Sequence, residues 1–190
     1  MSVGESSVVE GAGQQLLSRG SWKVDPAHSA VEFRVKRMVI ETVKGRFRDF
    51  EGGIASGARP TFSGVIKVAS LDTLHEERDA HLRSPDFFDV ESHPEIAFES
   101  SEITFDDDDP AFLLHGDLTI KGVTRPITLD GEFRGTGLAP DGTERIGLTL
   151  RGQFERSDFG LVWNRALETG GLLVGNTVNV DLDVSAIRVD

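Results

Sequence analysis

The 190-residue chain contains no cysteine and no tyrosine, and it has an excess of acidic over basic side chains. Without cysteine there are no disulfides, no thiolate ligands for zinc or iron-sulfur clusters and no cysteine nucleophile. The formal net charge of −12 opposes binding to nucleic acid, because affinity for phosphates comes mainly from lysine and arginine. We therefore expect neither a nucleic-acid partner nor a thiol-dependent activity.

The sequence also lacks the segments that direct chains to or through membranes. No apolar run approaches the roughly 20 residues that a membrane-spanning helix needs. Residues 1–20 have no basic stretch followed by an apolar core, and Glu5 and Glu10 stand where a secretory signal carries lysine or arginine. These features predict a flexible N-terminal segment over 1–20, a single domain over 21–190 and a cytoplasmic location.

Strand periodicity is the strongest pattern over the rest of the chain. Apolar and polar residues alternate in several runs, as they do in strands with one buried face. Turn signals separate the runs at 52–53, 122, 135–142 and 170–171. About eight such strands predict an all-β fold, either an antiparallel sandwich or an up-and-down barrel. The apolar positions of the runs are Val31, Phe33 and Val35; Phe112, Leu114, Leu118 and Ile120; Ile127, Leu129 and Phe133; Ile146, Leu148, Leu150 and Phe154; and Val178, Val180, Leu182 and Val184.

The segment 71–100 differs from the strand runs, because its first part has the composition of a charged helix. Thr73 and Glu76 have the spacing of a capping box, in which a threonine side chain caps the helix and a glutamate three residues later bonds back to it. This spacing predicts a helix that continues through about Leu82.

Two aromatic residues, Phe87 and Phe88, follow this helix. They come directly after a second start signal, Ser-Pro-Asp at 84–86, and before the next apolar run. Such a pair either plugs a packed core or closes the mouth of a β container over an apolar ligand. The chain's twelve phenylalanines favour an interior with few polar contacts, which suits a filled core and a ligand-holding barrel alike.

Titratable residues show no arrangement typical of catalysis or of metal binding. Ser157 and Asp158 lack the GxSxG elbow of serine hydrolases. The acidic run at 106–109 lacks the alternating ligands and the glycine of a calcium loop, and it predicts a solvated hairpin tip. We therefore expect no catalytic residue, no metal and no cofactor. The histidines are scattered without a compact metal motif, at His28, His75, His81, His93 and His115.

Four segments resemble the YceI-like family of polyisoprenoid-binding proteins. They are GRFRDFEGGI at 45–54, ASLDTLHEERDAHLRSPDFFDVESHPEIAFES at 69–100, GDLTIKGVTRPITL at 116–129 and RSDFG at 156–160. The string RDAHLRSPDFFDVE within the second segment is far more specific than a short motif. The resemblance extends over roughly 21–190 and implies a lipocalin-like antiparallel barrel with a helical insertion. The apolar lumen of such a barrel would hold a long isoprenoid chain, such as that of a quinone or a prenyl pyrophosphate.

The alternation and the resemblance together predict a ligand site built from apolar side chains. An anionic head group would lie near arginines, because a planar guanidinium can hold a pyrophosphate through two hydrogen bonds. The candidate head-group residues are Arg37, Arg78, Arg83 and Arg156. The candidate ligand-binding residues are Phe33, Phe47, Phe87, Phe88, Phe98, Phe112, Leu114, Phe133, Leu148, Phe159, Trp163 and Val180.

The expected function is non-enzymatic binding of a polyisoprenoid or another long-chain lipid, for transport or storage. The chain is expected to act either alone or as a homodimer. Two alternatives use the same fold. The first is a hydrolase or isomerase acting on a lipophilic substrate, which requires titratable groups that converge inside the cavity. The second is a structural β domain whose own side chains fill the lumen.

Overall fold

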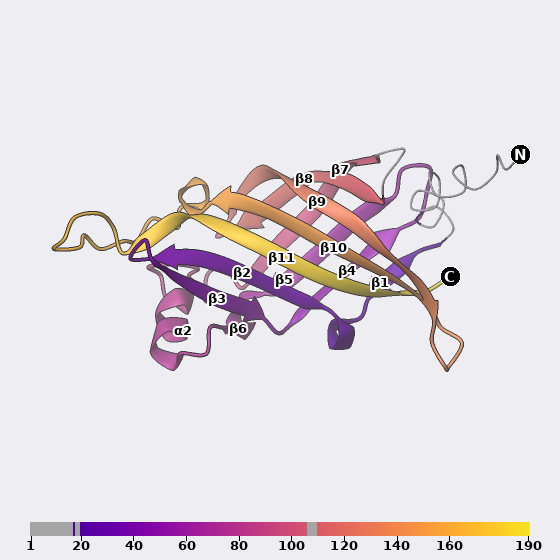
Figure 1. Ribbon diagram of the computed structural model, residues 1–190, viewed down its shortest axis with the longest axis horizontal. Helices are drawn as coiled ribbons and strands as arrows, with labels where there is room; N and C mark the ends of the chain where they lie inside the picture. The colour runs from indigo at the N-terminus through magenta and orange to yellow at the C-terminus, as the bar shows by residue number, and fades with distance from the viewer. Residues whose placement is uncertain (1–16, 18–19, 106–109) are drawn as a thin grey trace, which may run out of the picture.

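The computed structural model describes residues 17, 20–105 and 110–190, which form an antiparallel β-barrel (Figure 1). None of the helices within these ranges has the length and apolar character of a membrane span. The helical elements are η1 (Pro26–His28), η2 (Val68–Ser70), α2 (Glu76–Arg83) and η3 (Arg156–Phe159). The strands are β1 (Trp22–Val24), β2 (Ala30–Arg37), β3 (Glu41–Phe47), β4 (Phe50–Ala55), β5 (Thr61–Lys67), β6 (Leu71–Asp72), β7 (Glu95–Phe105), β8 (Ala111–Ile120), β9 (Val123–Leu138), β10 (Glu144–Glu155) and β11 (Val174–Arg188).

The described strands close into a ring in the order β1-β4-β5-β7-β8-β9-β10-β11, and β11 pairs back with β1. Toward α2, β2 replaces β1 alongside β11, while β3 and β6 continue the sheet from β2. Each short strand pair, β1 with β2, β3 with β4 and β5 with β6, therefore acts as one bent strand of the ring. The barrel is an up-and-down meander, as the sequence predicts, and the alternative of a sandwich is wrong.

The side chains on the inner face form two packed clusters. The first contains Trp22, Phe112 and Ala186 and lies toward the end that carries β1 and the C-terminus (Figure 1). The second contains Phe87 and Phe159 and lies beneath α2. The barrel therefore has a filled end and an end covered by the helical insertion.

The structure describes two residues of the N-terminal segment and none of the acidic run. Within the predicted flexible segment 1–20, the structure describes Leu17 and Gly20, and Leu17 is completely buried in the first cluster. The remainder of that segment and the predicted hairpin tip at 106–109 lie outside the described residues. The domain boundary at residue 21 stays a prediction.

Helix α2 begins at Glu76, two residues later than a cap at Thr73 predicts, and its cap is a different residue. The side chain of His75, not that of Thr73, accepts a hydrogen bond from a backbone N–H of the first turn. The chain turns before the helix because Asp72 accepts a hydrogen bond from the Leu74 N–H at 2.8 Å. The Thr73 hydroxyl instead donates to the buried carboxylate of Asp79.

Two of the predicted turns also need correction. Gly52 and Gly53 lie inside β4, where they pair with Gly64 and Ser63 of β5. Strand β9 continues through Leu138, so the turn predicted at 135–142 begins only after that residue. Gly53 marks a close approach, since a Cβ atom there would lie 2.8 Å from the Trp22 carbonyl oxygen, and Gly135, with a φ of 128°, lies beside a bulge between β9 and β10.

Candidate functional site

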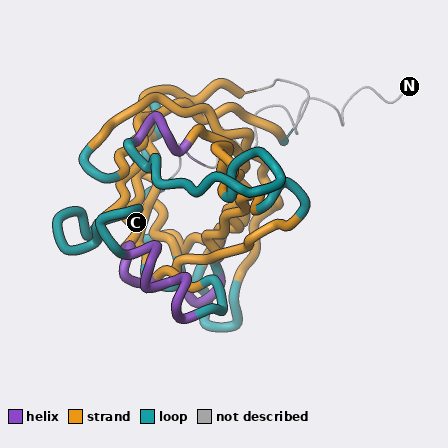
Figure 2. Tube along the Cα trace, turned by 90° about the vertical axis from the view of Figure 1, so that its left-hand side faces the viewer, coloured by secondary structure: helices purple, strands orange, loops and turns teal. Residues whose placement is uncertain are grey.

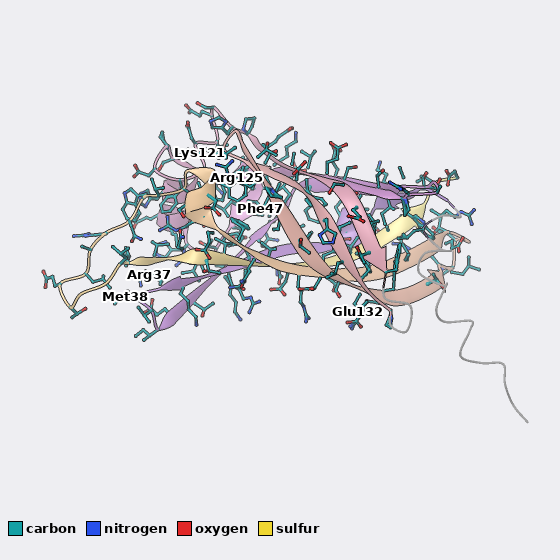
Figure 3. All side chains as sticks on the ribbon, turned by 90° about the horizontal axis from the view of Figure 1, so that it is seen from above. Arg37, Met38, Phe47, Lys121, Arg125 and Glu132 are labelled. Atoms are coloured by element: carbon teal, nitrogen blue, oxygen red, sulfur yellow. The ribbon has the colours of Figure 1, made fainter. Side chains whose placement is uncertain are left out.

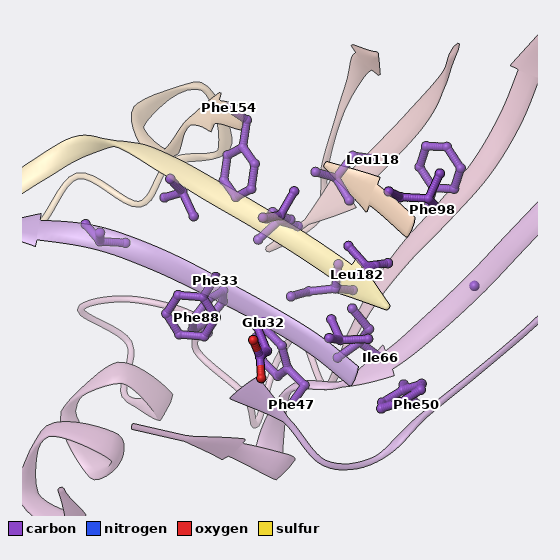
Figure 4. A pocket seen from close by; sticks show the side chains of 18 of the residues that line it. Glu32, Phe33, Phe47, Phe50, Ile66, Phe88, Phe98, Leu118, Phe154 and Leu182 are labelled. Carbon is purple, nitrogen blue, oxygen red and sulfur yellow. The ribbon is translucent and has the colours of Figure 1, made fainter. Parts of the chain in front are cut away.

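Figure 2 shows the ring of strands from the end that carries α2. A cavity of about 750 Å³ lies inside this ring and extends to α2 (Figure 4). This volume falls within the roughly 300–1,000 Å³ that is typical of sites for one small ligand. Most of the residues that line it are aliphatic or aromatic. They include Val31, Phe33, Val35, Phe47, Phe50, Ile54, Phe62, Ile66, Ile96, Phe98, Leu114, Leu118, Ile120, Leu148, Leu150, Phe154, Val178, Val180, Leu182 and Val184.

The inner wall keeps much of its apolar surface accessible. Phe33, Phe98 and Leu182 face the cavity, and all three are only partly buried although they belong to the inner face of the barrel (Figure 4). Trp22 and Phe112, in the first cluster, do not line the cavity and are each 2% exposed. Side chains therefore pack one part of the interior solidly and leave the other part open, so the lumen is not filled by the chain itself.

Glycines on neighbouring strands make room for aromatic rings along the wall. Phe33 pairs with Gly45 across β2 and β3, and a Cβ atom at Gly45 would lie 2.3 Å from the ring Cζ of Phe33. Phe98 covers Gly116 of β8 in the same way, with its Cζ 2.5 Å from such a Cβ atom. Each ring occupies the space of a missing side chain instead of projecting farther across the lumen. This arrangement explains how a barrel rich in phenylalanine keeps an open interior.

The predicted aromatic turn after α2 forms part of the cavity wall. The Phe88 N–H donates to the Leu82 carbonyl at 3.0 Å, which folds the turn back against the helix. Phe87 is 7% exposed and packs against Trp163, with ring centroids 5.4 Å apart. Phe88 meets Phe47 edge to face at 6.2 Å. The turn thus joins the helical insertion to both β3 and the segment after η3.

The cavity reaches the protein surface beside α2. His75 and Glu77 are exposed and line the cavity, as does the half-exposed Arg37 at the end of β2. Trp163 and Leu173, from the loop between η3 and β11, line the same region. We call this region, defined by these five residues, the mouth. Figure 3 shows Arg37 at the end of the barrel opposite to Glu132 of β9.

Comparison with known proteins identifies the family of this chain. The model of the YceI-like domain matches residues 22–186. The chain belongs to the YceI-like family. A UPF0312 protein of Staphylococcus aureus strain N315 is 37% identical over 162 residues, which are 83% of this chain and 91% of the relative. The predicted family and the lipocalin-like barrel with a helical insertion are confirmed.

Solved structures show the same YceI-like barrel. The Campylobacter jejuni YceI protein is 31% identical with a TM-score of 0.69, and the alignment covers 82% of this chain and 90% of that one. Burkholderia cenocepacia BcnA, at 22% identity, has a TM-score of 0.73 and coverages of 85% and 98%. A polyisoprenoid binding domain from Saccharophagus degradans, at 19% identity, has a TM-score of 0.69 and coverages of 90% and 100%. At the last two identities the likeness shows the fold alone.

The structure brings most of the predicted ligand-binding residues to the cavity of this YceI-like barrel. Phe112 and Phe133 are not among the residues that line it, because they pack on each other in the first cluster with ring centroids 4.8 Å apart. Phe159 packs on Phe154 beneath the cavity wall at 5.2 Å. Contact with a ligand stays a prediction for those on the wall, which are Phe33, Phe47, Phe87, Phe88, Phe98, Leu114, Leu148, Trp163 and Val180.

Sequence reasoning missed several wall residues. Leu118 and Leu182 belong to alternating runs that the sequence shows plainly, so the same signal could have found them. Phe50 and Phe154 also line the wall (Figure 4). Alternation shows which side chains of a strand face inward, but it does not show how far along the barrel axis each of them lies.

The four candidate head-group arginines all have partners within the protein. Arg37 forms an ion pair with Glu41 at 2.6 Å, and Arg78 donates to the hydroxyl and carbonyl oxygens of Thr73, each at 2.8 Å. Arg83 does not line the cavity. Its guanidinium donates to the backbone carbonyls at 69 and 71, which ties α2 to the strand before it.

Arg156 is a buried cation that lines the cavity and is held by backbone alone. Its side chain donates to the carbonyls of Leu161 and Trp163, at 2.6 and 2.9 Å, and to those of Val174 and Gly175, at 3.3 and 2.8 Å. Burial lowers the pKa of the Arg156 guanidinium from its ordinary value, because a charge is less stable away from water. The side chain thus joins the loop after η3 to the start of β11.

The titratable groups of the described residues do not form a metal site. Within the described ranges, no group of three His, Cys, Asp or Glu side chains could hold a metal ion. His81 lines the cavity, meets Trp163 edge to face with ring centroids 4.6 Å apart and contacts the Asp86 carboxylate at 2.9 Å. These contacts place the imidazole in the packing of the aromatic turn.

Proposed function

We propose that this YceI-like chain binds one long-chain isoprenoid, or a related lipid, in its lumen and carries or stores it without chemical change. The observation that carries the proposal is the apolar cavity of about 750 Å³. Each buried CH₂ group contributes roughly 0.8 kcal/mol before the cost of ordering the tail is subtracted, so affinity can come from the tail alone. The neighbour from Saccharophagus degradans, which is described as a polyisoprenoid binding domain, supports this ligand class. A quinone ligand, a homodimer and a cytoplasmic location stay predictions.

Native mass spectrometry of the gently purified chain tests this proposal. We expect one lipid per chain, which extraction and tandem mass spectrometry would identify. Delipidated protein should take up an isoprenoid and return it unaltered after incubation. A protein that carries no lipid and takes up no isoprenoid would refute the proposal, and a chemically altered lipid would favour the enzyme.

Gly45→Ala is expected to narrow the lumen and weaken lipid binding about 30-fold. The new methyl group would overlap the ring of Phe33, and the free side of that ring is the cavity. A ring that moves into the cavity displaces the equivalent of two to three CH₂ groups, which is about 2 kcal/mol of lost burial. Titration of delipidated protein with an isoprenoid measures the change.

Gly131→Ala is the matched control for this prediction. A Cβ atom at Gly131 would lie 2.3 Å from the ring of Phe112, which is 2% exposed and does not line the cavity. Overpacking there should lower the free energy of unfolding by about 1–3 kcal/mol and leave lipid affinity unchanged. If the two variants weaken lipid binding equally, the lumen beside Phe33 is not the binding site.

A further inference from the structure

Large apolar side chains are exposed around the mouth. Val39 and Ile40, in the turn between β2 and β3, are 76% and 81% exposed, and Leu74, before α2, is 88% exposed. In the loop between η3 and β11, Val162 and Leu172 are 67% and 56% exposed. Together with Met38, which is 38% exposed, we call these side chains the apolar rim. Elsewhere in the described ranges, the exposed large apolar residues are Leu113, Leu138 and Val189.

Each part of the apolar rim is adjacent in sequence to the mouth. Met38 follows Arg37, Leu74 precedes His75, and Leu172 precedes Leu173. Val162 likewise precedes Trp163. A hydrogen bond from the Met38 N–H to the Leu173 carbonyl, at 2.8 Å, joins two of the three segments directly. The rim therefore surrounds the place where the apolar cavity meets the surface.

The backbone of the rim is strained as well as exposed. Met38, Val39 and Leu74 have φ angles of 53°, 67° and 61°, in the left-handed region. Hairpin turns with two such residues in succession strongly favour Asn-Gly, and a β-branched valine in this region is an outlier. The chain thus combines backbone strain with apolar exposure at one site, a combination that is typical of functional surfaces.

We propose that the apolar rim docks the protein on a lipid bilayer, so that a lipid passes between the bilayer and the lumen without crossing water. This inference rests on the proposed function, since a water-insoluble cargo has to be exchanged with a membrane. The rim is continuous with the cavity wall through the mouth. Three separate turns present its side chains around an opening, a geometry that suits a fluid partner better than a partner with fixed pockets.

Charge complementarity indicates a neutral bilayer surface. The chain has a net charge of −12, and the rim is flanked by side chains of both signs, including Arg37, Glu41, Glu77 and Arg165. An acidic protein is repelled by an anionic membrane, and salt screens that repulsion. Docking should therefore come from insertion of apolar side chains into the interface and should weaken as anionic lipid is added.

Vesicle cosedimentation with the full-length chain tests the docking. We expect binding to phosphatidylcholine vesicles, weaker binding when phosphatidylglycerol is included, and partial recovery of that loss at high salt. The double substitution Val39→Asn, Ile40→Asn should weaken binding roughly 100-fold, because it removes two apolar side chains from the interface. Leu138→Asn is the matched control: Leu138 is 75% exposed in β9 but lies outside the rim, and its loss should leave vesicle binding unchanged.

Thermal unfolding separates docking from folding. Asparagine adopts the left-handed region more readily than valine, so Val39→Asn should raise the Tm by about 2–4 °C while it weakens vesicle binding. The docking proposal would be overturned if the wild type bound no vesicle. It would also be overturned if Val39→Asn lowered the Tm and left vesicle binding unchanged. If the rim substitutions instead abolish a dimer in analytical ultracentrifugation, the occupant is a second copy and the docking proposal is wrong.

Native mass spectrometry on the same proteins keeps the two proposals apart. Lipid in the lumen without vesicle binding would refute the docking and leave the lipid-binding function intact. A chain that holds no lipid but binds vesicles through the rim would refute the proposed function instead. We expect the rim variants to retain lipid already in the lumen and to lose the fast exchange with vesicles.

Discussion

Arg156→Met is expected to lower the Tm by about 8–16 °C. The substitution leaves three backbone carbonyls, those of Leu161, Trp163 and Gly175, without the guanidinium donor, whereas the Val174 carbonyl keeps a hydrogen bond from the Asn164 side chain at 2.8 Å. Each unsatisfied buried carbonyl costs about 1–3 kcal/mol, and some will find water, so we expect a total loss of about 4 kcal/mol. Arg156→Lys should fall between this variant and the wild type, because one ammonium group cannot reach both segments in the geometry of a guanidinium. Thermal unfolding followed by circular dichroism gives the order.

Ligand titration distinguishes this structural role from recognition of a head group. With Arg156→Lys we expect equal changes in affinity for a prenyl pyrophosphate and for a neutral isoprenoid. A loss confined to the pyrophosphate would show that Arg156 holds the head group. Arg37→Met is the control for stability: Arg37 pairs with Glu41 at the surface, and such a pair contributes at most about 1 kcal/mol.

The role of Arg156 illustrates what the sequence could not predict. Its acceptors are the carbonyls of residues 161, 163, 174 and 175, and carbonyls carry no sequence signal. The strands were predictable, because the period of two along each strand depends only on which face is buried. The choice of a barrel over a sandwich came from the resemblance to the YceI-like family. Arginines near the predicted helix and the aromatic pair after it were reasonable head-group candidates by chemistry. Their actual partners depend on a fold that brings distant backbone together.

The cavity wall shows the same division between local and distant information. Alternation predicts that Phe33 and Phe112 face inward, and both do, but Phe33 lines the cavity while Phe112 is packed in the first cluster. The difference depends on depth along the barrel and not on the facing residue, since each ring lies over a glycine of the neighbouring strand, Gly45 for Phe33 and Gly131 for Phe112. The predicted cap of α2 was wrong for a related reason. Asp72 folds the chain into a turn that removes Thr73 from the capping position.

Phe88→Asp is expected to weaken lipid binding roughly 100-fold at neutral pH. Phe88 is half-buried on the cavity wall, against Phe47. In the lipid-free protein, water entering the lumen can hydrate the introduced carboxylate. A bound isoprenoid would displace that water, and an unpaired charge against an apolar surface costs about 3 kcal/mol or more. The substitution should therefore reduce affinity, measured by titration of delipidated protein, more than it reduces the Tm of the lipid-free protein.

The pH dependence of this loss provides a second test. Because the lipid disfavours the charged form, it should raise the pKa of the introduced carboxyl group above its lipid-free value, which is about 4 for an accessible aspartate. Affinity should then be largely restored below the lipid-free pKa and lost as pH rises through the lipid-bound pKa. Phe88→Asn should bind with intermediate affinity and without this pH dependence, and Leu138→Asp, outside the cavity, should bind like the wild type. Equal affinity of the wild type and Phe88→Asp at pH 7 would show that the lipid does not contact the aromatic turn.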